Sequence, residues 1–92
     1  MKTIVYGSMI CPDTRNILDL FAKNGIDVDF KDVTAEIANL KSFINLREGN
    51  KVFEKARLTN KIGIPYFILP DGKETIDEAE ALFALLPGGN EH

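Results

Sequence analysis

The stretch KTIVYGSMICPDTRNILDLF, residues 2–21, decides the fold because a strand-forming run passes directly into a helix-forming run within it. Residues 2–6 are rich in β-branched and aromatic side chains, which predicts a short buried strand. From Pro12 onward, apolar residues recur at the spacing of an amphipathic helix, and Gly25 is a suitable left-handed residue for its end. The single cysteine, Cys11, falls at the junction of these two elements.

The next segment predicts a second strand. Apolar and acidic residues alternate over residues 26–30 (IDVDF), which is typical of a half-exposed strand. Two strands joined by a helix form a parallel pair with a right-handed crossover. This topology brings the end of the first strand, and Cys11 just beyond it, to the edge of the sheet where ligands bind.

A second helix is expected from a cap at Thr34 to about Arg47, with Ile37, Leu40 and Ile44 on one face. A short additional helix is expected over residues 52–56.

The segment KIGIPYFILPDGKETI, residues 61–76, contains two apolar runs joined by a Pro-Asp-Gly turn, which predicts an antiparallel hairpin of residues 66–69 and 73–76. Asp77, followed three residues later by Glu80, resembles the start of a final helix. The predicted order is βαβα(α)ββα, an α/β fold with a four-stranded mixed sheet flanked by helices. We expect one domain over residues 1–87 and a flexible tail over residues 88–92.

Composition narrows the classes of function. A chain of 92 residues that is 45% hydrophobic suits one core, and a net charge of −3 with scattered basic residues argues against nucleic-acid or membrane partners. The sequence has no long apolar run and no secretory leader, so we expect a cytoplasmic protein. We also expect a monomer. One cysteine forms no internal disulfide, and any redox chemistry therefore needs a thiol from another molecule.

Cys11 admits two interpretations, a packed small hydrophobe or a reactive thiol. Unpaired N–H groups at a helix N-terminus favour the thiolate, which is the nucleophilic form. Thr14 is positioned to donate its hydroxyl to the sulfur, and Arg15 adds positive charge, whereas Asp13 opposes the thiolate. The position after the first strand favours the reactive interpretation.

Three motifs carry a family resemblance: CPDT at residues 11–14, ANLKSFINLR at residues 38–47 and GIP at residues 63–65. In this order they resemble glutaredoxin-related proteins of the thioredoxin-like superfamily, over nearly the whole chain. The resemblance implies a thioredoxin-like fold. Sequence alone favours a trans Ile64–Pro65 bond, but the family resemblance implies a cis bond with Pro65 facing the Cys11 sulfur.

The resemblance also implies a chemistry. Cys11 is expected to attack a mixed disulfide, usually one with glutathione, and the backbone of Ile64 to pair with the substrate as a short strand. Lys61 and Arg57 are expected to receive a glutathione carboxylate, unless they form only a solvated helix face. No metal or bound organic cofactor is implied; glutathione is the expected co-substrate, and protein thiols or disulfides are further expected partners.

The chain departs from the family pattern at three places. Thr14 stands where dithiol glutaredoxins have a second cysteine, which leaves a monothiol route. Pro12 stands where cluster-binding monothiol glutaredoxins have glycine, which argues against an iron–sulfur cluster. Asp77 and Glu78 stand where the family has a Gly-Gly pair that holds the glutamyl group of glutathione, and their charges should repel its carboxylate, although Asp77 also suits a helix cap.

We therefore predict a monothiol, glutaredoxin-like thiol–disulfide oxidoreductase acting on glutathione mixed disulfides or similar small thiol adducts. Two alternatives stay open: a non-catalytic binding module on the same fold, and an arsenate-reductase-like thiol enzyme, whose Cys-x-x-Ser/Thr-Arg-Asn start CPDTRN also resembles. The predicted catalytic residues are Cys11 and Thr14. The predicted substrate-binding residues are Pro12, Arg15, Arg57, Lys61, Ile64, Pro65 and Asp77.

Overall fold

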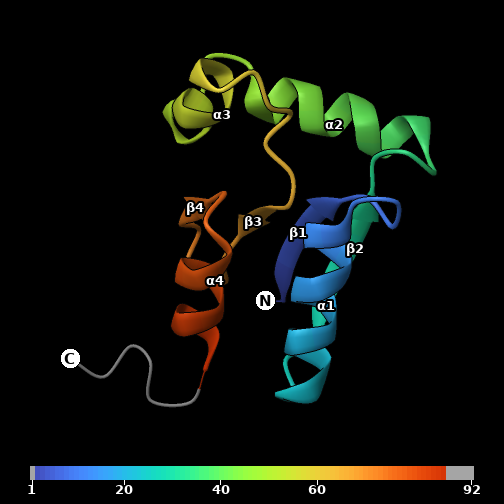
Figure 1. Cartoon of the computed structure of the whole chain (residues 1–92), viewed down its shortest axis with the longest axis vertical. Helices are drawn as coiled ribbons and strands as arrows, with labels where there is room; N and C mark the ends of the chain where they lie inside the picture. The colour runs from blue at the N-terminus through green and yellow to red at the C-terminus, as the bar shows by residue number, and fades with distance from the viewer. Residues whose placement is uncertain (1, 87–92) are drawn as a thin grey trace.

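The computed structural model describes residues 2–86 and contains a four-stranded mixed sheet with helices on both faces (Figure 1). This α/β arrangement confirms the predicted thioredoxin-like fold class. In chain order the elements are β1 (Thr3–Gly7), α1 (Pro12–Lys23), β2 (Val28–Asp32), α2 (Ile37–Arg47), η1 (Lys51–Phe53, a 3₁₀ turn), α3 (Glu54–Leu58), β3 (Tyr66–Ile68), β4 (Glu74–Thr75) and α4 (Glu78–Leu85).

The strands lie in the order β2-β1-β3-β4. β1 and β2 are parallel, with Val5 opposite Phe30, whereas β3 is antiparallel to β1 and places Phe67 opposite Val5. β4 completes the hairpin with β3. The parallel pair and the hairpin are both as the sequence predicts, so the carboxyl end of β1 and the amino end of β3 meet at one edge.

The second strand begins two residues later than predicted. The N–H of Ile26 donates to the carbonyl of Phe21 at 2.8 Å, because Gly25 adopts a left-handed φ of 68° and folds the chain back onto the end of α1. Ile26 is therefore used to end the helix, and the strand begins only at Val28. The predicted hairpin strands are likewise longer than the observed ones.

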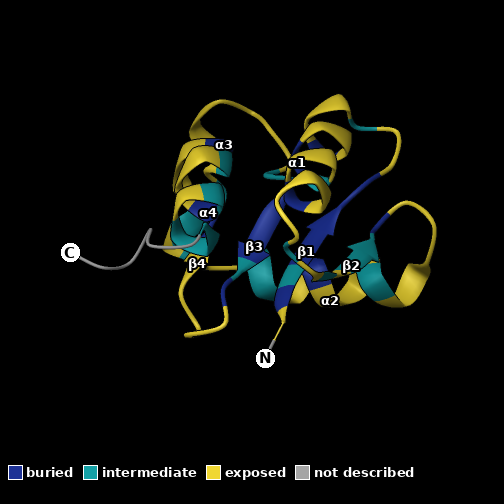
Figure 2. Cartoon of the chain, turned by 90° about the horizontal axis from the view of Figure 1, so that it is seen from below, coloured by how far each residue is buried: buried dark blue, intermediate teal, exposed yellow. Residues whose placement is uncertain are grey.

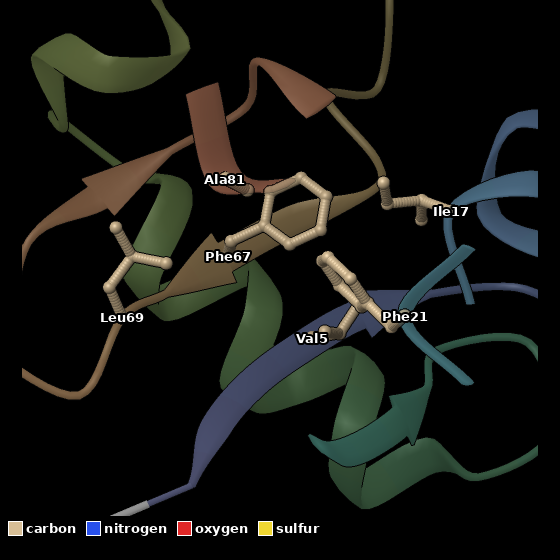
Figure 3. Close-up of a cluster of buried hydrophobic side chains, with 6 residues drawn as sticks. All are labelled: Val5, Ile17, Phe21, Phe67, Leu69 and Ala81. Carbon is tan, nitrogen blue, oxygen red and sulfur yellow. The ribbon is translucent and has the colours of Figure 1, made fainter. Parts of the chain in front are cut away.

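One face of the sheet packs against α1 and α4 (Figure 3). The rings of Phe21 and Phe67 meet edge to face, with their centroids 6.0 Å apart and their planes at 76°. The buried members of this cluster are Val5, Ile17, Phe21, Phe67, Leu69 and Ala81.

The other face packs against α2 and η1. It is dominated by aromatic rings, and the closest pair, Phe53 and Tyr66, has centroids 4.7 Å apart. The buried members of this cluster are Tyr6, Val33, Phe43, Phe53 and Tyr66. Buried residues therefore lie along β1 and β3, between helices whose outer surfaces are exposed (Figure 2).

The predicted cap of α2 was wrong. The residue that caps it is Glu36, not Thr34, and the apolar stripe of Ile37, Leu40 and Ile44 is exposed. Phe43 lies on the adjacent face of the helix and is 2% exposed. Its ring packs among three other rings of the aromatic cluster, and this contact turns the aliphatic stripe toward solvent.

The start of α4 is as predicted: the carboxylate of Asp77 accepts the N–H of Glu80 at 3.0 Å. The N–H of Asp77 donates to Thr75 instead of to the Glu80 side chain, so the capping box is half complete. Within residues 2–86, no helix has the length and hydrophobicity needed to cross a membrane. The predicted tail, residues 88–92, lies outside the described residues.

Candidate functional site

Cys11 is the residue that caps the N-terminus of α1. Its backbone is extended (φ −93°, ψ 119°), its N–H donates to the carbonyl of Ser8 at 2.9 Å, and its carbonyl accepts the N–H of Arg15 at 3.1 Å. Pro12 occupies the first helical position, where a missing N–H costs no hydrogen bond. The side chain of Cys11 is partly exposed and forms no cap hydrogen bond, so its sulfur is left available at the helix end.

The loop before Cys11 is fixed by buried and partly buried hydrogen bonds. Ser8 is 1% exposed; its hydroxyl lies 2.6 Å from the hydroxyl of Thr34 and accepts the N–H of Ile10 at 3.2 Å. The N–H of Ser8 donates to the Thr14 hydroxyl at 3.3 Å. These bonds set the direction in which the chain enters α1 and thereby position Cys11.

Asp32, at the end of β2, accepts a hydrogen bond from the same loop. Its carboxylate accepts the N–H of Met9 at 3.2 Å, and it also accepts the N–H and the hydroxyl of Thr34 and the N–H of Ala35. The Thr34 hydroxyl contributes most to lowering the pKa of Asp32, and the backbone donors add to it.

Thr14 has a packing role that the sequence did not reveal. It is fully buried, and a Cβ added at Gly7 would lie 2.7 Å from both its methyl and its hydroxyl. Glycine at position 7 is thus required by the close approach of β1 to α1. Across residues 2–86, no hydrogen bond joins the Thr14 hydroxyl to the Cys11 sulfur, so its predicted role as a donor to the sulfur remains a prediction.

A hollow of about 600 Å³ lies between the N-terminal turns of α1 and α4 and the segment that connects α3 to β3. Ile64 and Pro65 line it, and the bond between them is cis, as the family resemblance implied and sequence alone did not. Pro65 is buried. Asp13, two residues after Cys11, also lines the hollow and so links it to the thiol end of α1.

The charges around the hollow are of both signs. Asp13, Asp77 and Glu78 supply carboxylates, and Lys55 and Lys61 supply amines. Burial is the main cause of the raised pKa of Glu78, and repulsion by Asp13 and Asp77 adds to it. Across residues 2–86, none of these five side chains belongs to a salt bridge.

Two of the predicted basic residues have other locations. Arg57 lines a separate hollow with Ile44 and Arg47, because residues two apart on a helix point about 200° away from each other and Lys55 already faces the Pro65 side. Arg15 donates to the carbonyl of Met9 at 3.1 Å, which helps to fix the loop. Of the predicted substrate-binding residues, the hollow includes Lys61, Ile64, Pro65 and Asp77.

The sequence reasoning missed three residues as parts of the site: Asp13, Lys55 and Glu78. The sequence indicates Asp13 only as a charge that opposes the thiolate, and Glu78 only as a departure from the family pattern. Lys55 and Thr59 lie four residues apart and therefore share one helix face. This spacing was the signal in the sequence that α3 lines the hollow. In the part of the chain that the structure describes, no group of three His, Cys, Asp or Glu side chains is placed to hold a metal ion.

The sequence is 32% identical over 76 residues to an uncharacterized protein of Haemophilus influenzae, and the match covers 83% of this chain and 88% of that protein. The chain belongs to that protein's family. No protein-family model matches the chain, and no solved structure matches it. The shared span reaches over most of both chains, so the family relationship concerns the whole fold rather than one motif.

Proposed function

We propose that the chain is a monothiol, glutaredoxin-like thiol–disulfide oxidoreductase with Cys11 as its nucleophile. The observation that carries this proposal is the position of Cys11 at the N-terminus of a twelve-residue helix, in the same turn as a residue that lines a hollow of about 600 Å³. Helix-end N–H groups favour a thiolate, and the hollow offers room for the group attached to the disulfide under attack.

The backbone of Ile64 supports a role in substrate binding. Ile64 lies outside the β3 ladder, and within residues 2–86 neither its N–H nor its carbonyl has a hydrogen-bond partner. An extended substrate backbone could pair with both groups, as a strand added to a sheet edge does. Lys61, on the same hollow, is the basic residue that we propose for a substrate carboxylate.

The reaction proceeds in two exchanges. The Cys11 thiolate attacks one sulfur of the substrate disulfide, a new S–S bond forms to that sulfur, and the other thiol leaves as a thiolate that takes up a proton. A second small thiol such as glutathione then attacks this mixed disulfide, forms a disulfide with the bound thiol and releases Cys11 as a thiolate. Thr14 cannot supply a resolving sulfur, so the small thiol is the reductant.

The test uses two disulfide probes. One is the neutral bis(2-hydroxyethyl) disulfide, and the other is oxidised glutathione. We expect intact mass to show one adduct on the reduced protein, formed at least about tenfold faster than on a peptide of residues 8–16, which has the same local sequence without the fold. Cys11→Ser should form no adduct. Added glutathione should then sustain turnover coupled to glutathione reductase and NADPH; a rate equal to that of the peptide would contradict the proposal.

A non-catalytic binding module is the second candidate, favoured by Asp77 and Glu78 in the place of the glycine pair. It predicts adduct formation without turnover. The arsenate-reductase-like alternative is less well supported, because the arginines do not gather around Cys11. Arg47 donates to two backbone carbonyls and, with Arg57, lines the separate hollow.

A further inference from the structure

β2 forms one edge of the sheet, and β1 is its only neighbour among the described strands. We infer that a second copy of this chain pairs with this edge, β2 against β2 in antiparallel orientation, across a two-fold axis between the two copies of Phe30. The two four-stranded sheets would then become one continuous sheet. This inference departs from the monomer expected from the sequence, and it does not depend on the proposed thiol chemistry.

The outer edge of β2 has backbone groups without partners. The N–H of Val33 donates to the carbonyl of Gly7 at 2.9 Å, and the direction of the backbone groups alternates along a strand. The odd-numbered residues of β2 therefore point their backbone groups to β1, and the even-numbered residues Val28, Phe30 and Asp32 point theirs away. Within residues 2–86, both backbone groups of Phe30 and the N–H of Asp32 have no hydrogen-bond partner.

This edge has room for a second strand. Most residues of β1 are buried, whereas those of β2 are half-buried or exposed (Figure 2). A hollow of about 390 Å³ lies along the first part of β2 and is lined by Lys2, Ile4, Val28, Asp29 and Phe30. An unprotected edge is a template for another strand, which would lie about 4.8 Å away and place its side chains over this hollow.

The charges of β2 select one register. Asp29 and Lys31 lie on one face of the strand, on either side of Phe30, and they pair with each other at 3.5 Å while remaining 51% and 34% exposed. When the two copies of Phe30 lie opposite each other, each Asp29 faces Lys31 of the second copy. These facing residues are not bonded through the backbone, and in such pairs the side chains come closest and opposite charges are favourable.

The neighbouring registers are unfavourable. Outward-pointing backbone groups have to meet outward-pointing groups, so the register shifts only in steps of two residues. A shift in one direction places Asp29 opposite Asp29, and a shift in the other places Lys31 opposite Lys31. Like charges directly opposite each other are destabilising. Of these three registers, only the one centred on Phe30 brings opposite charges together, and it does so twice because of the two-fold axis.

The same register uses the free backbone groups. The two copies of Phe30 exchange N–H to carbonyl hydrogen bonds, and each Val28 carbonyl accepts the N–H of Asp32 of the second copy. The Asp32 carbonyl already accepts the N–H of Glu36 at 3.3 Å and the side-chain amide of Asn39 at 3.1 Å, so the ladder ends there. The half-buried Phe30 rings meet across the axis and extend the apolar cluster on the α1 face.

A single strand pair makes a small interface. Interfaces below about 1,200 Å² are typical of weak pairs, so we expect a dissociation constant on the order of 10–100 µM. Sedimentation velocity of the full chain should show the mass rising from 10.2 kDa towards twice that value between about 5 µM and about 1 mM. A mass that stays at that of one copy up to about 1 mM overturns the inference.

Two charge reversals test the register. In Lys31→Glu and in Asp29→Lys, both facing pairs become like-charged, so we expect each variant to associate with itself at least about tenfold more weakly than wild type. A mixture of the two variants restores opposite charges at both pairs of a mixed dimer, and it should associate about as tightly as wild type. A mixture that associates no better than either variant overturns the register.

Lys41→Glu is the matched control. It makes the same change of charge as Lys31→Glu, at an exposed residue of α2 that joins no salt bridge within residues 2–86. Lys41 also lies beside the exposed stripe of Ile37, Leu40 and Ile44, the other apolar surface on which a second copy could dock. The control should change the dissociation constant by less than about twofold. Equal weakening by Lys41→Glu and Lys31→Glu would overturn the inference.

Amide exchange of the wild-type chain tests the edge without a variant. The N–H of Phe30 is free in one copy and bonded in the pair, whereas the N–H of Lys31 points to β1 in both states. Raising the concentration from about 5 µM to about 1 mM should slow exchange at Phe30 roughly tenfold and leave Lys31 nearly unchanged. If the mass doubles while exchange at Phe30 stays the same, the second copy docks elsewhere and the inference is wrong.

Discussion

Two carboxylates on opposite sides of the Cys11 segment have opposite environments. Asp32 contacts the loop before Cys11 and accepts hydrogen bonds from Met9, Thr34 and Ala35, which hold its pKa below the ordinary value. Glu78 faces the turn after Cys11, where burial and the charges of neighbouring acids raise its pKa.

The two environments indicate that the two carboxylates have different structural roles. On the Asp32 side, negative charge is matched by donors and is used to build the loop. On the Glu78 side, the carboxylate accepts no hydrogen bond and joins no salt bridge within residues 2–86, although Lys55 and Lys61 line the same hollow. The first side fixes the loop that precedes the thiol, and the second lines the hollow with carboxylates.

We expect the largest loss of stability from a substitution that overpacks the contact between β1 and α1. Gly7→Ala places a methyl group 2.7 Å from the Thr14 side chain, which cannot yield because it is fully buried. We expect the free energy of unfolding to fall by about 2–3 kcal/mol, as overpacking of a closed core does. Urea denaturation followed by circular dichroism measures the change.

A double variant tests the cause. Gly7→Ala/Thr14→Ala removes the atoms that the new methyl group meets, so its unfolding free energy should exceed the value expected from adding the two single effects. Additive effects would show that Gly7 matters for a reason other than its contact with Thr14.

The second-largest loss of stability is expected from weakening the hydrogen bonds that Asp32 accepts. Asp32→Asn should lower the free energy of unfolding by about 1 kcal/mol at neutral pH, because four hydrogen bonds to a charged acceptor are weakened. The pKa of Asp32 is depressed in the folded state, so its contribution is present above the ordinary value of 3.8 and is lost as the pH falls through the folded value. The difference between wild type and variant should shrink when unfolding is measured at about pH 3; a constant difference would contradict this account.

The smallest effect is expected at Glu78 and has the opposite sign. A carboxyl whose folded pKa is raised binds its proton more tightly in the folded state, so stability is lost as the pH rises from the ordinary value of 4.5 through the folded value. Glu78→Gln should therefore stabilise the protein by about 0.5 kcal/mol near neutral pH and have no effect below about pH 4. Thermal unfolding at both pH values measures it, and a loss of stability at neutral pH would show that the charge at the start of α4 is favourable on balance.

Much of the fold could be predicted from local patterns. The bounds of α1 follow from Pro12 and the apolar spacing after it, and the cap at Asp77 follows from its place before a helix-forming run. Cys11 could be placed at the sheet edge because a βαβ unit has one handedness. Each of these features depends on neighbours in sequence or on a general rule of topology.

The remaining features depend on contacts between distant residues. The exposed stripe of α2 reflects competition between two faces of one helix, which the ring of Phe43 wins by packing against β1, η1 and β3. Asp13 and Glu78 line one hollow although they are 65 positions apart in the sequence, and no local pattern links them. Arg57 lines a different hollow from Pro65, which could not be foreseen because its helix is only five residues long and its orientation is set by packing.

Arg47 bears on the local unfolding of the segment that precedes Pro65. Its guanidinium lies 5.9 Å from the centre of the Phe53 ring, and it donates to the carbonyls of Lys61 and Ile62 at 3.0 and 2.8 Å. The segment that leads to Pro65 is thereby fastened to the end of α2, so the two should undergo local unfolding as one cooperative unit. The planar guanidinium reaches the two carbonyls through two nitrogens in a fixed fork, and because lysine lacks this geometry, Arg47→Lys should uncouple amide exchange in the segment from amide exchange in the helix.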